Sequence, residues 1–220
     1  MKLTPCFPTA LHEEAAVIVC DYLRPMPAVD SVLIVNSCAR GQAVPESDLD
    51  FAILVKPRST AMQISNIESE WRAYSQKQSV LIKYTASHPF AHLHLDVIDG
   101  NYKPMNIEKG EPIDYFEVEI GNQIHYSAPM ETAGLYFKEL RDKWLPYYAD
   151  TLRLERLTAS RSACEYDLDH IPSLVERALH FHAFDTLWQA FQKYLKPFLL
   201  PIKHILLLTT NGLKNRLYNG

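Results

Sequence analysis

The sequence predicts a mixed α/β fold of the α+β class, in which a mixed sheet flanked by helices is followed by an all-helical domain. Two short runs rich in β-branched residues, Val32 to Val35 and Phe51 to Val55, are each bounded by turn residues, which is typical of buried strands. From Met130 onward the apolar residues recur at helical spacing. With 220 residues, 47% of them hydrophobic, the chain is long enough for one large domain or two small ones.

Helical patterns flank these strands in the first part of the chain. Thr9 predicts the N-cap of a helix that runs to about Arg24, where two prolines follow. Thr60 and Gln63 have the spacing of a capping box at the start of a second helix. The apolar run from Val80 to Tyr84 predicts another short strand.

Alternating residues predict further strands. From Ala91 to Gly100, apolar and polar side chains alternate, which indicates a strand with His94 and Asp96 on one face. The segments from Tyr115 to Ile120 and from Gln123 to Tyr126 predict a hairpin around a Gly-Asn turn.

The remaining chain is predicted to be helical. Pro172 suits the first turn of a helix. A last helix is predicted from Ile202 to Leu208. Between them runs an apolar stripe that predicts a helix packed into a core: Leu174, Ala178, Phe181, Trp188, Phe191 and Leu195.

The composition excludes some classes of function. A formal net charge of −4 argues against a general affinity for nucleic acid. The four cysteines form no Cys-x-x-Cys pair, so we expect neither a structural zinc site nor a disulfide framework. The N-terminus lacks an apolar signal core, and no run approaches the ~18 apolar residues of a membrane span. We therefore expect a cytoplasmic protein without membrane contacts.

Asp48 and Asp50 are the strongest candidates for chemistry. They open the second apolar strand and point to the same side of it, because side chains alternate faces along a strand. Two adjacent carboxylates repel each other unless a cation lies between them. Mg²⁺ is the simplest solution, since it is commonly held by one or two carboxylates together with phosphate oxygens.

The turn before these carboxylates carries groups that suit phosphate. Ser37, Arg40 and Gly41 supply a hydroxyl, a guanidinium and a flexible backbone. The backbone N–H groups of such a turn can bind an anion, and arginine adds charged contacts to phosphate. Phosphate-binding groups beside metal ligands predict a nucleoside triphosphate bound with Mg²⁺.

The same residues carry a resemblance to a known family. The run Asn36-Ser37-Cys38-Ala39-Arg40-Gly41, followed by Ser47-Asp48-Leu49-Asp50, resembles the signature of the nucleotidyltransferase superfamily that includes DNA polymerase β. The usual form is Gly-Ser, then Ala-Arg-Gly, then Ser-Asp-x-Asp. Asn36 replaces a glycine that lets the backbone approach the triphosphate. Asparagine adopts positive φ more readily than most residues, so the turn can persist, although its side chain could crowd the phosphates.

The resemblance implies roles for individual residues. Asp48, Asp50 and Asp96 would be metal ligands, and Asp96 would also take the proton from the attacking hydroxyl. Two Mg²⁺ ions ~3.5–4 Å apart would hold the attacking and leaving oxygens. His94 is expected to support the ligands or face the substrate. The nucleotide would be bound by Asn36, Ser37, Arg40 and Ser47, the last of which would brace the carboxylates through its hydroxyl.

A helical domain after the catalytic domain is typical of antibiotic-modifying members of this superfamily. The resemblance therefore implies a catalytic domain over residues 1–129 and a helical domain over residues 130–220 that closes the cleft and contacts the acceptor. Lys193 and Lys203 are candidates for a triphosphate contact, although a solvated helix face is the simpler interpretation. The implied activity is transfer of an NMP group, AMP from ATP in the first instance, to a hydroxyl of a small molecule or a protein. A homodimer is compatible with the sequence.

Three other interpretations stay open. Minimal (MNT-type) nucleotidyltransferases of similar signature act as antitoxins of helical HEPN-class nucleases, whose Arg-x₄₋₆-His spacing is matched by Arg177 and His182. A nucleotide-binding pseudoenzyme that acts through a protein partner is suggested by Asn36. His92, His94 and Asp96 also match the His-x-His-x-Asp motif of binuclear zinc hydrolases, but the histidine that normally follows this motif is absent.

Overall fold

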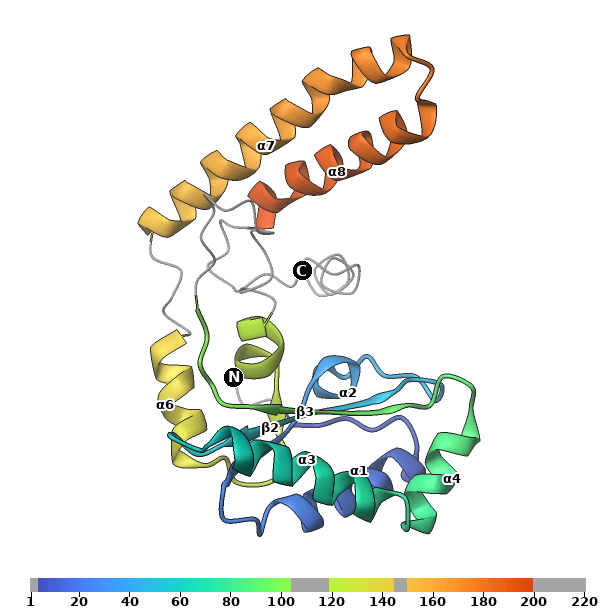
Figure 1. The fold of residues 1–220 in the computed structure, drawn as a ribbon, viewed down its shortest axis with the longest axis vertical. Coiled ribbons are helices and arrows are strands. Elements are labelled where there is room, and N and C mark those ends of the chain that lie inside the picture. The colour runs from blue at the N-terminus through green and yellow to red at the C-terminus, as the bar shows by residue number, and fades with distance from the viewer. Residues whose placement is uncertain (1–3, 104–118, 145–149, 200–220) are drawn as a thin grey trace. The chain divides into compact units, whose positions relative to one another are not determined.

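The structure is a computed structural model that describes residues 4–103, 119–144 and 150–199. The chain divides into two compact units, one formed by residues 1–104 and 119–144 and the other by residues 105–118 and 145–220. The first unit contains a four-stranded sheet, and the second contains a hairpin of two long helices (Figure 1). Helix α6 (Leu135–Trp144), which follows the expected boundary at residue 129, belongs to the sheet unit.

The sheet is mixed and has the strand order β3-β2-β1-β4. β1 (Val29–Ile34) pairs antiparallel with β2 (Leu49–Val55), and β2 pairs parallel with β3 (Leu93–Ile98). The short β4 (Ala128–Pro129) pairs antiparallel with β1 at the other edge. The predicted mixed α+β fold is confirmed, and so are the three predicted strands that correspond to β1, β2 and β3.

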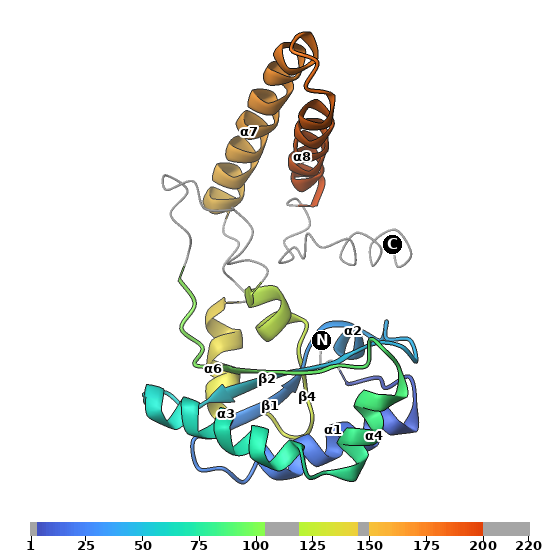
Figure 2. The same cartoon turned by 45° about the vertical axis from the view of Figure 1, so that its right-hand side comes forward.

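Three helices cover one face of this sheet: α1 (Ala10–Leu23), α3 (Ala61–Ser75) and α4 (Ser79–Ser87) (Figure 2). Alternate residues of β2 point towards them and are buried in the same apolar core as the inner faces of the helices. These residues of β2 are Leu49, Phe51, Ile53 and Val55.

Both predicted helix caps are confirmed. At the start of α1, the side chain of Thr9 accepts a hydrogen bond from the backbone N–H of His12. Before α3, Thr60 and Gln63 form the reciprocal capping box predicted from their spacing. Such caps depend only on neighbouring residues, and the sequence therefore reveals them directly.

The opposite face of the sheet carries the carboxylates. Because side chains alternate, Asp50, Ala52 and Leu54 point away from α1, α3 and α4. The π-helix η2 (Gly121–His125) and α6 bury residues that are not part of the core shared with α1, α3 and α4, whereas helix α2 (Asn36–Arg40), which follows β1, contributes Cys38 and Ala39 to that core. Helix α6 contacts both β1 and η2.

Two strand predictions are wrong for the described residues. The run from Val80 to Tyr84 belongs to helix α4, in which Leu81 and Tyr84 are buried at a helical spacing while Ile82 is exposed. The predicted hairpin is replaced at Glu119–His125 by helical turns, in which Ile120 and Ile124 share a buried face. A short apolar run is compatible with the periodicity of a strand and with that of a helix, and here packing favoured the helix.

The second unit consists, in its described part, of α7 (Asp150–Glu176) and α8 (His180–Leu199). The two helices pack through small or polar residues: Ser160, Cys164 and Asp167 are buried on α7, and Ala183 and Ala190 on α8. Lys193 Nζ donates a hydrogen bond to Asp167 Oδ2 over 2.5 Å, so this lysine joins the two helices.

The apolar stripe predicted for this region does not form a single buried helix. Pro172 lies inside α7 rather than in a first turn, and the chain reverses at Ala178, which has φ +55°. Phe181, Trp188 and Phe191 are exposed, because the face of α8 that packs on α7 carries alanines instead.

Several expectations lie outside the described residues, namely those for Tyr115 to Val118, for the helix from Ile202 to Leu208 and for Lys203. The expectation of a complete all-helical domain stays a prediction. Within the described ranges, no helix combines the length and apolar character needed to cross a bilayer.

Candidate metal centre

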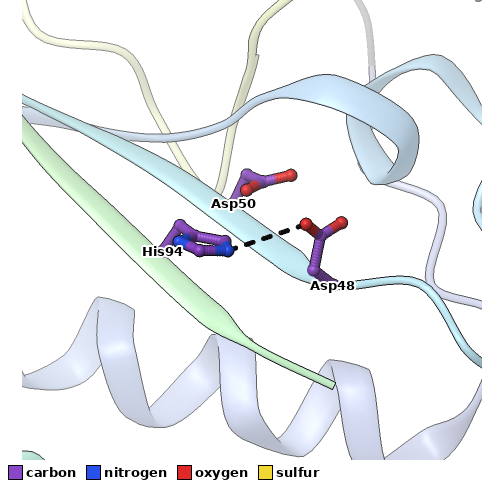
Figure 3. A group of neighbouring side chains, drawn as sticks. All are labelled: Asp48, Asp50 and His94. Carbon is purple, nitrogen blue, oxygen red and sulfur yellow. Dashed lines mark ion pairs between the residues drawn. The ribbon is translucent and has the colours of Figure 1, made fainter. Parts of the chain in front are cut away.

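Asp48, Asp50 and His94 meet near the N-terminal ends of β2 and β3 (Figure 3). The parallel register of the two strands pairs Asp50 with His94. Each of the three side chains offers one ligand atom, and these atoms all lie within 4.8 Å of one another. His94 Nε2 and Asp48 Oδ2 are 3.8 Å apart. Two carboxylates and an imidazole in this arrangement could hold a metal ion.

The two carboxylates have different surroundings. Asp50 is 8% exposed, whereas the side chain of Asp48 is 42% exposed. Burial raises the pKa of Asp50 above its ordinary value, a hydrogen bond with the Asn36 side chain lowers it, and the charge of Asp48 raises it again. The ionised form of Asp50 is therefore costly in the metal-free protein, and a bound cation would offset that cost.

Asp96 lies outside this group of three. It is exposed, two residues beyond His94 on the same face of β3, and the strand register pairs it with Ala52. Its charge still contributes to raising the pKa of Asp50. The sequence predicts Asp96 as the third ligand and His94 beside it, because alternation puts both side chains on one face of the strand and does not show which of them faces Asp50.

The turn before the carboxylates contains the short helix α2. Its first residue, Asn36, has φ +56°, in the left-handed region where glycine is favoured, and Gly41 ends the helix with φ +69°. The predicted ability of Asn36 to adopt positive φ is confirmed. The side chain of Asn36 is hydrogen-bonded to the Asp50 carboxylate, and this bond links α2 directly to the carboxylate pair.

Arg40 is partly buried at the end of α2. Its Nη1 donates to Asn122 Oδ1 over 3.3 Å, and its buried Nε has no hydrogen-bond partner within the described part of the chain. Burial lowers the pKa of Arg40, while the nearby Tyr126 and Asp50 raise it. The guanidinium stays charged, as arginine does in proteins, and it retains donor capacity for a ligand.

Ser37 and Cys38 follow Asn36 in α2. Ser37 Oγ is buried beside the Cys38 thiol, which is a weak hydrogen-bonding partner. Burial, followed by the charge of Asp50, raises the pKa of Cys38 to about 12. Cys38 is therefore an inert thiol at neutral pH, and the hydroxyl of Ser37 is the more useful group for a phosphate.

Ser47 makes contacts that differ from the expected brace. Its hydroxyl accepts a hydrogen bond from the backbone N–H of Val44 over 2.9 Å. Its carbonyl, directly before Asp48, accepts one from the Tyr84 hydroxyl over 3.1 Å and lies 3.0 Å from His12 Nε2. The carbonyl can only accept, so His12 Nε2 carries a proton. Two buried side chains thus fix the backbone that leads into Asp48.

The other candidate sites are not assembled in the same way. Arg177 and His182 are both exposed at the α7–α8 turn, so neither is packed in a core. A cavity of about 370 Å³ opens between α3, α4 and β3 and is lined by Trp71 and Leu81 from the main core, on the face of the sheet opposite the carboxylates. Its lining is mainly apolar, so it offers no rival metal centre.

Comparisons of the chain with protein-family models, with curated proteins and with solved structures found no match. The functional interpretation therefore depends on the site itself.

Proposed function

We propose that this protein is a metal-dependent nucleotidyltransferase, which moves an NMP group from a nucleoside triphosphate, with ATP as the first candidate, to a hydroxyl group. The observation that carries the proposal is the direct link between a group of side chains that could hold a metal ion and the turn that carries Arg40. Asp48, Asp50 and His94 form the first, and Asn36 connects Asp50 to α2, which holds Arg40.

The groups of α2 suit the phosphates. Arg40 offers a charged donor whose Nε is unpaired within the described residues, and Ser37 offers a buried hydroxyl. A triphosphate between these groups and a metal would meet positive charge from both sides, which phosphoryl chemistry requires. Asn36 would lie at the position where the superfamily signature has a glycine.

A divalent ion held by the carboxylates would neutralise the phosphate charge and orient the phosphate oxygens. The acceptor oxygen attacks the α-phosphorus and forms a new O–P bond. The bond from the α-phosphorus to the bridging oxygen breaks, and pyrophosphate leaves. Asp96 is the proposed base for the hydroxyl proton, because it is exposed on the strand face that carries His94.

Nucleotide binding tests this proposal without knowledge of the acceptor. ATP, GTP, CTP and UTP would be titrated calorimetrically with Mg²⁺, with Mn²⁺ or with EDTA. We expect at least one nucleotide to bind about tenfold or more tightly when the metal is present, which corresponds to about 1.4 kcal/mol. The double variant Asp48→Asn/Asp50→Asn should lose this metal dependence, while circular dichroism shows a retained fold.

A matched control is Glu68→Gln/Glu70→Gln, which removes two exposed carboxylates from α3. This control should bind as the wild type does. Metal-dependent binding that survives unchanged in the Asp48→Asn/Asp50→Asn variant would refute the proposed site.

A nucleotide-binding pseudoenzyme acting through a protein partner is the second candidate. The observation in its favour is Asn36, whose side chain is engaged with Asp50 where a glycine would leave open space. The two functions differ in turnover. An enzyme releases pyrophosphate and transfers the α-phosphate label to an acceptor, whereas a pseudoenzyme binds the nucleotide without either event.

A further inference from the structure

His94 is placed at the candidate metal centre by strand pairing. β3 runs parallel to β2, and Asp50 is the register partner of His94. Two ligands of one ion, each ~2.1 Å from it, can be at most ~4.2 Å apart. The 3.8 Å between His94 Nε2 and Asp48 Oδ2 is within this limit. Since all three ligand atoms lie within 4.8 Å of one another, small side-chain rotations would bring them around one ion.

An ion pair between His94 and Asp48 alone does little for the fold. Both side chains are about half exposed, and ion pairs between exposed side chains contribute little to stability. Asp50 is the costly group, because it is buried and adjacent in space to another carboxylate. An ion bound by all three side chains would offset the cost of burying the ionised Asp50 carboxylate. An imidazole that only pairs with Asp48 at the surface would not offset this cost.

We propose that His94 is a direct metal ligand through Nε2 and that the site therefore prefers Mn²⁺, or another first-row transition ion, to Mg²⁺. Imidazole nitrogen is a good ligand for transition ions, whereas Mg²⁺ selects oxygen ligands in a strict octahedron. Asp96, outside the group of three, is then free to act on the acceptor hydroxyl. The role of the ion in nucleotidyl transfer rests on the proposed function, but whether His94 binds the ion is tested separately.

The experiment measures metal binding with no nucleotide present. MnCl₂ and MgCl₂ are titrated calorimetrically into the wild type, into His94→Gln and into His92→Gln, the neighbouring exposed histidine directly before β3. We expect the wild type to bind Mn²⁺ about tenfold or more tightly than Mg²⁺. His94→Gln should lower Mn²⁺ affinity by about tenfold or more and Mg²⁺ affinity by less than about threefold. His92→Gln should match the wild type.

Pulsed electron paramagnetic resonance of the bound Mn²⁺ gives a second readout that does not depend on variant stability. The wild-type complex should show the ¹⁴N coupling of one imidazole, and this coupling should be lost in His94→Gln and kept in His92→Gln.

The outcomes separate this inference from the proposed function. Bound Mn²⁺ without ¹⁴N coupling, or with an affinity unchanged in His94→Gln, would overturn the role of His94 and leave the carboxylate site intact. Loss of the coupling in His92→Gln instead would overturn it as well. Absence of any binding of either ion would contradict both proposals.

Discussion

Asp50 is a residue whose position lowers the stability of the folded protein. It is buried among apolar strand residues, and its carboxylate is close to that of Asp48. The hydrogen bond with Asn36 only partly offsets the effect of burial on its pKa. Groups with perturbed pKa values of this kind cluster at functional sites, where stability is sacrificed for chemistry.

Asp50→Asn is expected to raise the melting temperature of the metal-free protein at pH 7. The folded-state pKa of Asp50 lies above its unfolded value, so the ionised carboxylate lowers stability at pH values above the folded-state pKa. This loss of stability becomes smaller as the pH drops, and it is absent below the pKa of an aspartate in the unfolded chain, about 3.9. Thermal melts in EDTA across this pH range measure the effect. A variant that is less stable than the wild type at neutral pH would show that the carboxylate supports the fold.

Asn36 allows a matched pair of variants. Its φ of +56° is accessible to glycine and unfavourable for alanine, so Asn36→Ala should be less stable than Asn36→Gly by about 1 kcal/mol. Both lose the hydrogen bond that lowers the pKa of Asp50, so their metal affinity should fall more steeply than that of the wild type as the pH is lowered, because protons compete better for Asp50. Chemical denaturation and metal titration measure the two effects. Equal stability of the two variants would argue against the left-handed conformation.

At the scale of helices and strands, features that depend on neighbouring residues could be predicted from the sequence, whereas features that depend on tertiary packing could not. The caps at Thr9 and Thr60 involve residues three positions apart, so their spacing is sufficient evidence. The segment around Leu81 is too short and too apolar for its sequence to distinguish a strand from a helix, and in the structure it belongs to helix α4. On α8, the apolar residues exceed what one partner helix covers, so a stripe that predicts a core is exposed in the described structure.

Asp30 connects β1 to α6. Its carboxylate oxygens accept hydrogen bonds from the backbone N–H groups of Tyr136 and Phe137, each over 3.1 Å, and from the Ser31 hydroxyl over 2.9 Å. Gly134 approaches so closely that a Cβ atom there would lie 2.3 Å from the Asp30 carboxylate. The carboxylate therefore acts as the N-terminal cap of α6.

Asp30→Ala should lower the free energy of unfolding by about 1–2 kcal/mol, because the first N–H groups of α6 lose their acceptor. Asp30→Asn keeps one acceptor oxygen and should lose less. Urea denaturation followed by fluorescence measures both. If alanine and asparagine at this position were equally harmless, α6 would not depend on the cap.

At the scale of the whole molecule, the site depends on a pairing between distant strands. The sequence predicts that Asp48 and Asp50 share a side of β2, because alternation is a local rule. It does not predict the parallel register that pairs Asp50 with His94 and Asp96 with Ala52. The candidate group of three therefore differs from the expected ligand set by one residue of the same strand face, although the three strands expected around it and the carboxylate pair are present.

The central claim is that these carboxylates hold a metal that also binds a triphosphate, and pulsed electron paramagnetic resonance of Mn²⁺ with ATP and the protein tests it most directly. The account predicts a protein-bound Mn²⁺ spectrum, distinct from that of free Mn²⁺–ATP, with ³¹P couplings from the phosphates. The complex should be lost in Asp48→Asn/Asp50→Asn and weakened in Arg40→Gln. A spectrum identical to that of free Mn²⁺–ATP, or a protein complex unchanged in the double variant, would contradict the account.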